Sequence, residues 1–266
     1  MDGSPLGFAE LLTAISMLGY SLFAWIFAVR LLRTVRGTWS LPEVSLATGY
    51  LFVAGIGYPM IAASIGAWES LGETTALSIQ IVGAIILRVG LAGIFVFTWQ
   101  TFRAEAGWAR ALTIVGILLL AANTVHGFIA LLNAPSFDAA VVVAGRGPAA
   151  IASIALAALA FCWPAAESLG YYLKLRRRQA LGLADPVVVN RFLLWGIACA
   201  SSVFIACANV ATAVAGRNIM EYQPAMITSA TLGIMNSILL ILAFLPPASY
   251  LHFVRRRAGM APSLPE

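Results

Sequence analysis

Charged residues are scarce in this chain, and their scarcity indicates the class of protein. Only 10% of the 266 residues are Asp, Glu, Lys or Arg, whereas 61% are hydrophobic and the mean hydropathy is +0.91. A soluble domain carries about 25% charged residues, so this composition predicts a polytopic membrane protein. The net charge of +5 comes mainly from short stretches beside apolar segments. We interpret it as a signal of membrane orientation, and we expect no nucleic-acid partner.

Lysine, histidine and cysteine are also rare, and each shortage excludes a kind of site. Lys174 is the only lysine and lies at the end of an apolar segment, so a retinal Schiff base on the seventh segment is impossible. His126 and His252 are the only histidines, which is too few for a bis-His haem pair in the core or a three-His hydrolase site. The three cysteines all lie within apolar segments, so we expect no disulfide outside the membrane. We therefore expect no cofactor and no metal.

Catalytic motifs are missing as well. The sequence contains no GxSxG, HExxH, Walker A or GxGD pattern. No nucleophile–base pair or metal cluster can be assembled at one depth in the membrane. We therefore expect that the protein is not an enzyme.

Long apolar runs are what the chain has in abundance. Seven of them reach or exceed the roughly 20 residues that a membrane-crossing helix needs, and short polar turns separate them. The sequence therefore predicts an all-α integral membrane bundle of seven transmembrane helices, forming one domain over residues 1–266. The expected helices cover about 8–32, 43–67, 75–102, 108–132, 148–174, 188–214 and 224–253.

Basic residues near the ends of these runs are distributed very unevenly. With Arg88 set aside, they divide 13 to 2 between the two sides of the predicted bundle. The larger group contains Arg30, Arg33, Arg36, Arg103, Arg110, Lys174, Arg176, Arg177, Arg178, Arg191, Arg255, Arg256 and Arg257, and the smaller one Arg146 and Arg217. Because cytoplasmic loops carry the excess of Lys and Arg, we expect the N-terminus outside and the C-terminus inside. We expect a bacterial-type inner membrane.

The turn between the fifth and sixth segments is the most informative one. The sequence YYLKLRRRQAL continues past the membrane edge, so we expect the fifth helix to extend until Gly182 ends it. Asp185 suits a helix N-cap and Pro186 the first helical position. The basic residues of this hairpin are Lys174, Arg176, Arg177, Arg178 and Arg191. They are either an anchor for anionic lipid headgroups or a docking surface for a cytoplasmic partner.

Arg88 is the first functional candidate, because it lies near the middle of the apolar run Thr75–Phe102. A guanidinium keeps its charge, so it must face the bundle interior and find an acceptor or water there. From a rise of 1.5 Å per residue, Arg88 lies roughly 18 Å deep and Asn236 roughly 16 Å deep. Glu167 comes out roughly 8 Å closer to the inner face and is the best acidic partner, with Asn236 as the alternative. Such a pair could equally be a tie that only fixes helix packing.

A second group of polar residues is expected in the outer half of the membrane. It consists of Glu10, Tyr58, Gln80, Asn123, His126 and Asn209, which come from five different helices. If these side chains turn inward, they line a ligand-binding cavity that opens outward and has Arg88 and Asn236 at its floor. Each one alone is more typical of a hydrogen bond between helices. Their shared depth favours the cavity.

Prolines inside the runs indicate where helices bend. Pro59, Pro164 and the pair Pro246–Pro247 are expected to kink or locally open the second, fifth and seventh helices. The carbonyl groups that they free need polar neighbours or water. These bends are either hinges or static features.

Three classes of function remain open after these exclusions. We favour a receptor or sensor that binds a small or lipidic ligand in the cavity. We expect no soluble output domain after the seventh run, so such a receptor would signal through a separate cytoplasmic or membrane protein. The alternatives are a transporter or channel for a small solute that pairs with Arg88, and a structural subunit of a larger membrane complex.

Overall fold

The computed structural model describes residues 7–136, 139, 147–217 and 222–257, and these form helices and turns. Seven helices are long and apolar enough to cross a membrane, which confirms the predicted all-α bundle. They are α1 (Phe8–Thr34), the continuous helix α2–η1–α3 (Leu41–Tyr50, Leu51–Gly57 and Tyr58–Gly66), α5 (Glu73–Phe102), α6 (Gly107–Leu132), α8 (Pro148–Ala180), α9 (Pro186–Val214) and α10 (Gln223–Phe244). Two shorter helices are α4 (Trp68–Leu71) and α11 (Ala248–Arg257).

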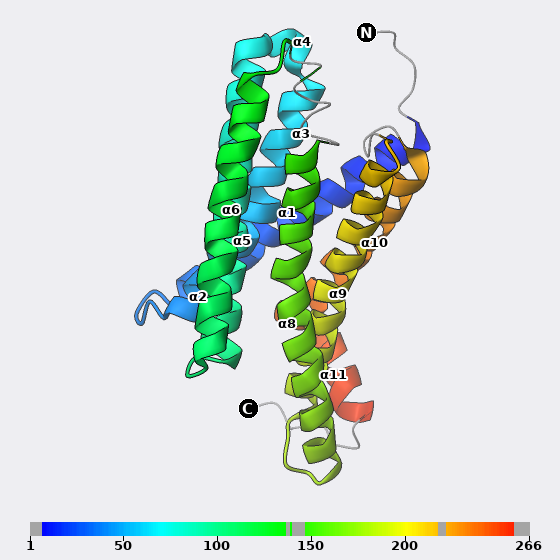
Figure 1. Ribbon diagram of the computed structural model, residues 1–266. Coiled ribbons are helices and arrows are strands. Elements are labelled where there is room, and N and C mark those ends of the chain that lie inside the picture. The colour runs from blue at the N-terminus through cyan, green and yellow to red at the C-terminus, as the bar shows by residue number, and fades with distance from the viewer. Residues whose placement is uncertain (1–6, 137–138, 140–146, 218–221, 258–266) are drawn as a thin grey trace.

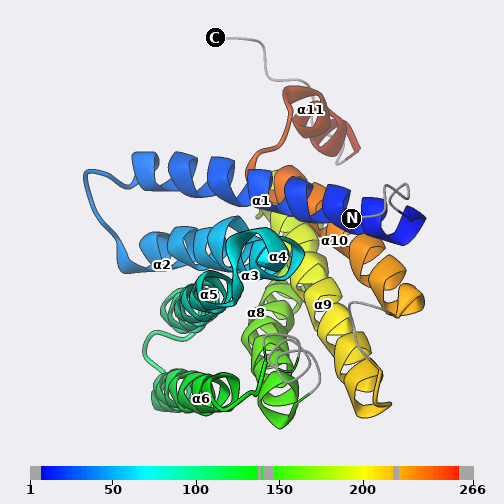
Figure 2. The ribbon, with the colours of Figure 1, turned by 90° about the horizontal axis from the view of Figure 1, so that it is seen from above.

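The seven spans form a closed ring (Figures 1 and 2). Helix α1 packs against α10, α10 against α9, and α9 against α8. Helix α8 contacts α6 and α5, and α5 packs along α2–η1–α3, which returns to α1. Each span therefore has one side toward the ring interior and one side available to lipid.

The two ends of the bundle differ in charge. Helices α1, α5, α8 and α10 all finish at the end where α11 lies, toward the bottom of Figure 1. We call it the basic end, because it carries the thirteen Lys and Arg residues counted above from Arg30 to Arg257.

The turn between α8 and α9 has the expected geometry. Helix α8 continues to Ala180, and Gly182 ends it with a φ of +72°, a value that glycine adopts without strain. The Leu183 N–H donates to the Arg178 carbonyl at 2.9 Å, which is the long hydrogen bond of a Schellman motif. The Asp185 carboxylate accepts from the Val187 N–H at 2.8 Å, so the predicted N-cap is confirmed.

The prolines act in three different ways. Pro59 follows the π-helix η1 and has no N–H to offer the carbonyl of Gly55, four residues earlier. The Trp25 indole N–H donates to that carbonyl at 3.1 Å instead. Pro164 is accommodated inside the continuous helix α8. At Pro246–Pro247 the chain breaks: α10 ends at Phe244 and α11 begins at Ala248, so the expected seventh helix, 224–253, is two helices.

Aromatic side chains fill the half of the ring next to the basic end. This aromatic core contains Phe23, Phe27, Tyr50, Phe95, Phe97, Phe102, Phe161, Trp163 and Trp195. Trp195 lies near its centre, with ring centroids 5.1 Å from Phe97 and 5.8 Å from Phe102. The Trp195 indole N–H donates to the Tyr50 hydroxyl at 3.3 Å, so the buried polar tip of the indole is satisfied.

Candidate functional site

A cavity of about 490 Å³ occupies the other half of the ring, and all seven spans contribute to its wall. Its volume falls within the range of about 300–1,000 Å³ that is usual for small-molecule sites. Many of the side chains on the wall are small. They include Ala54, Ala84, Gly127, Ala150, Ala157, Ala206, Ala230 and Gly233. The space therefore exists because the facing helices carry too little side-chain volume to fill it.

Arg88 lies on the wall of this cavity without a counter-ion among the described residues. Its Nη1 donates to the carbonyl of Ala84 on the same helix at 3.0 Å, and its buried Nε has no hydrogen-bond partner. On the neighbouring helix α6, Gly127 leaves room beside the guanidinium, because a Cβ added there would lie 3.9 Å from Nη2. The cavity thus contains a positive charge whose donors are incompletely used.

Asn236 of α10 also lines the cavity. Its Nδ2 donates to the hydroxyl of Ser202 on α9 at 2.8 Å, whereas its Oδ1 is buried without a partner. The side chain is 4% exposed. An unpaired buried amide oxygen is costly, and this one has almost no accessible surface of its own.

Other polar side chains also line the cavity, closer to the opposite end of the bundle. Gln80 of α5 is 3% exposed, and its Oε1 has no partner. The Ser229 hydroxyl of α10 donates to Oδ1 of Asn209 on α9 at 3.3 Å. Tyr58 of α3 lines the cavity as well. The structure therefore brings Arg88, Asn236, Asn209, Gln80 and Tyr58 to the lining of one cavity.

The expected contact between Arg88 and Glu167 is not formed. Glu167 is the partner of Arg103, whose Nε donates to Oε1 at 2.8 Å, and the Trp163 indole N–H lies 3.4 Å from the same oxygen. This hydrogen bond to Glu167 raises the pKa of the Arg103 guanidinium. The reason for the correction is position: Glu167 faces the end of α5, beside the aromatic core, while Arg88 faces the cavity.

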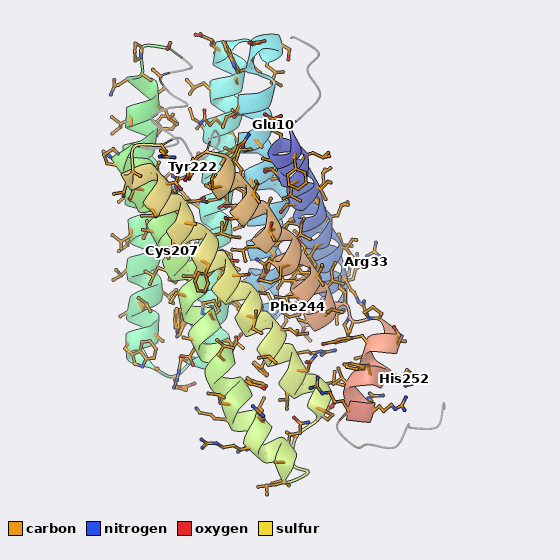
Figure 3. All side chains as sticks on the ribbon, turned by 90° about the vertical axis from the view of Figure 1, so that its right-hand side faces the viewer. Glu10, Arg33, Cys207, Tyr222, Phe244 and His252 are labelled. Atoms are coloured by element: carbon orange, nitrogen blue, oxygen red, sulfur yellow. The ribbon has the colours of Figure 1, made fainter. Side chains whose placement is uncertain are left out.

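Three other expected cavity residues lie elsewhere. Asn123 is buried between α6 and α8, where its Nδ2 donates to the Ala149 carbonyl at 3.0 Å. His126 is exposed on the outer surface of α6. Glu10, near the exposed start of α1 in Figure 3, accepts from the Gly7 N–H at 3.1 Å and caps that helix. None of the three is part of the cavity wall.

Ser202 and Ser229 are cavity residues that the sequence reasoning did not single out. Each lies seven residues from an asparagine on its own helix, Ser202 before Asn209 and Ser229 before Asn236. Residues seven apart share a helix face, so this spacing was the available signal.

The hairpin residues Lys174, Arg176, Arg177, Arg178 and Arg191 are all exposed at the basic end. The Lys174 ammonium lies 5.3 Å from the centre of the Tyr171 ring, a cation–π distance. Within the described ranges, no group of three His, Cys, Asp or Glu side chains could hold a metal ion.

Comparisons with family models, with curated proteins and with solved structures gave no match. The function is therefore argued from the cavity itself.

Proposed function

We propose that this protein is a receptor-like membrane protein that binds a small or lipidic anion in its cavity. The observation that carries the proposal is Arg88, a charged side chain on the cavity wall with no carboxylate partner in the described part of the chain. A charge within the membrane is expensive unless it is paired or hydrated. An anionic ligand group would provide the missing partner, and a bidentate contact with a guanidinium is strong and directional.

The aromatic core favours binding over conduction. Phe161 belongs both to the cavity wall and to the aromatic core. Beyond it, toward the basic end, Phe95 is completely buried and Leu91 is 1% exposed. A channel needs a continuous polar or hydrated path, and these packed side chains occupy its course. The proposed role is therefore ligand binding rather than an open pore or catalysis.

The distribution of basic residues supports an orientation with the basic end in the cytoplasm and the N-terminus outside. In this orientation the cavity lies in the outer half of a cell membrane, such as a bacterial inner membrane. Helices α8 and α9 both line the cavity and meet in the exposed basic hairpin. A ligand that shifts these two helices would move the hairpin, where anionic lipid headgroups or a partner protein would sense the change.

Decanoate provides a direct test of anion binding. Full-length protein in nanodiscs of neutral lipid is titrated with decanoate and with decanol, and bound amphiphile is measured against empty nanodiscs. We expect decanoate to bind more tightly than decanol, and Arg88→Gln to weaken decanoate binding about 10- to 100-fold, the value of a charge-assisted hydrogen bond.

Arg110→Gln is the matched control, because Arg110 is exposed at the basic end, and it should bind decanoate as the wild type does. Arg88→Lys should restore only part of the affinity, since an ammonium cannot make the bidentate contact. Thermal unfolding is used to check that the wild type and Arg88→Gln are both folded. If both are folded and bind decanoate equally well, Arg88 is excluded as the anion site. Uptake of decanoate into sealed proteoliposomes, abolished by Arg88→Gln, would assign the protein to the transporters instead.

A further inference from the structure

One nitrogen of the Arg88 guanidinium remains both unpaired and accessible. Nη1 donates to the Ala84 carbonyl at 3.0 Å, and Nε is fully buried. Nη2 has no hydrogen-bond partner in the described part of the chain and, unlike Nε, keeps accessible surface. Each Nη of a guanidinium carries N–H groups that only donate. Nη2 is therefore the atom of Arg88 at which a ligand can supply an acceptor.

Nη2 lies where α5, α6 and α8 come together (Figure 2). A Cβ added to Gly127 of α6 would lie 3.9 Å from Nη2 and 3.9 Å from the Cβ of Ala149 on α8. These are the only two contacts within 4 Å that the added atom would make with described residues beyond its own helix turns. The missing side chain thus leaves an open space between the guanidinium and Ala149, which we call the Gly127 niche. Both residues line the cavity.

Other glycines inside the bundle show that close helix packing does not require this one. A Cβ on Gly83 or Gly90 of α5 would lie 2.8–2.9 Å from atoms of α3 or η1, and a Cβ on Gly233 of α10 would collide with the Ser16 hydroxyl. At Gly127 an added Cβ would make ordinary van der Waals contacts. Alanine is also the better helix former. Neither packing nor helix stability therefore accounts for the glycine at position 127.

The cavity wall next to the niche is apolar. On α6 it is formed by Phe128 and Leu131, and on α8 by Ile154 and Ala157. Leu131 lies four residues after Gly127, so the two share a helix face. An apolar chain attached to an anion in the niche would be buried against these side chains.

From this arrangement we infer that Gly127 determines which anions the cavity binds. The carboxylate of an unbranched fatty-acid-like ligand accepts from Arg88 Nη2 in the Gly127 niche, and its apolar chain lies against α6 and α8. This inference rests on the proposed function and adds to it a residue that limits the size of the anionic group. Arg88 is the only charged residue among the described wall residues, so the niche beside it is where the anion belongs.

The test changes the size of the niche and leaves Arg88 in place. Full-length wild type, Gly127→Ala and Gly127→Val in neutral-lipid nanodiscs are titrated with decanoate, and bound amphiphile is measured against empty nanodiscs. We expect Gly127→Ala to weaken decanoate binding about two- to tenfold, the value of one hydrogen bond, and Gly127→Val to weaken it further. The wild type should bind 2,2-dimethyldecanoate more weakly than decanoate, because two methyl groups next to the carboxylate do not fit the niche.

Gly19→Ala and Gly19→Val are the matched controls. Gly19 of α1 is exposed, has no neighbour within 4 Å for an added Cβ and is not part of the cavity wall, so both variants should bind decanoate as the wild type does. Gly127→Ala should unfold at or above the wild-type temperature.

A second pair of variants narrows the niche from α8, so that the test does not depend on Gly127→Val being folded. Ala149→Val should weaken decanoate binding as well. Ala152→Val, exposed on the same helix and outside the cavity wall, should not.

The outcomes separate this inference from the proposed function. Suppose that decanoate binding depends on Arg88, but that folded Gly127→Ala and Ala149→Val both bind like the wild type, or that 2,2-dimethyldecanoate binds as tightly as decanoate. The Gly127 inference is then wrong and the proposed function stands. If decanoate binding does not depend on Arg88, both fail.

Discussion

The same seven helices build a hollow half and a packed half, and the difference lies in side-chain volume. The hollow half is lined by small residues such as Ala84, Gly127 and Gly233, whereas the packed half is filled by Phe95, Trp195 and other aromatic rings. In a membrane no hydrophobic effect drives helices together, so close packing provides much of the attraction. The aromatic core therefore holds the bundle together and leaves the other half free to remain open for a ligand.

The π-helix η1 lies at the boundary between the two halves. Val53 and Ala54 of η1 line the cavity, and Tyr50, directly before it, belongs to the aromatic core. Single π-helical turns are frequent at functional sites because they widen the backbone locally. Here the Gly55 carbonyl, to which Pro59 has no N–H to donate, accepts from the side chain of Trp25, so a side-chain hydrogen bond adds to the backbone hydrogen bonds at this boundary.

Replacing a buried phenylalanine by alanine should give the largest difference in stability between variants of the packed half and variants of the hollow half. Phe95 is completely buried, and its ring lies against Gly116, where an added Cβ would be 3.0 Å from Cζ. Phe95→Ala leaves a void whose lining loses its van der Waals contacts. We expect a loss of about 3 kcal/mol in the free energy of unfolding, measured by denaturation of the purified protein in mixed micelles.

Phe128→Ala is the matched control in the hollow half. Phe128 lines the cavity and is 37% exposed, so its removal enlarges a space that already exists. We expect a loss of less than about 1 kcal/mol in the free energy of unfolding. Equal losses for the two variants would mean that the aromatic core does not dominate the stability of the bundle.

Adding side-chain volume should also affect the stability of the two halves differently. Ala160 of α8 is completely buried in the aromatic core, whereas Ala157, one turn earlier, lines the cavity. Ala160→Leu overpacks the core and should cost about 2 kcal/mol. Ala157→Leu grows into open space, so it should leave thermal stability close to that of the wild type and weaken decanoate binding.

The decisive comparison is between stability and binding in the same two variants. A folded Ala157→Leu protein that binds decanoate with wild-type affinity would show that the ligand does not use this part of the cavity. A fully stable Ala160→Leu protein would show that the packed half contains more free volume than its buried aromatic rings indicate.

Which polar residues lie within the spans could be predicted from the sequence, whereas the rotation of each helix about its axis could not. Arg88 and Asn236 were expected to line a cavity, and both do. Counting residues placed His126 beside Asn123, yet the first is exposed and the second buried. Which side of a helix faces inward depends on all its neighbours. Polar residues spread around an apolar helix do not reveal that side.

Local chemistry was predictable for a related reason. The end of α8 at Gly182 and the N-cap at Asp185 follow from residues only a few positions apart. The partner of Glu167 could not be predicted in this way, because Arg103 is 64 residues away in sequence. The depth estimate favoured Arg88, and the packing of α5 against α8 placed Arg103 at the carboxylate instead. The cavity itself depends on such long-range packing, so its volume could not be predicted.

A substitution at the boundary between the two halves should have the smallest effect on stability. Trp25→Phe keeps an aromatic ring but removes the N–H that donates to Gly55 at 3.1 Å. The Ser21 hydroxyl, 3.5 Å from the same oxygen, can compensate in part, so we expect a loss of about 1 kcal/mol or less. Trp108→Phe is the control, because the Trp108 indole N–H has no hydrogen-bond partner among the described residues, and it should change unfolding less. If Trp25→Phe is as stable as Trp108→Phe but weakens decanoate binding, the hydrogen bond positions η1 for the ligand instead of stabilising the boundary.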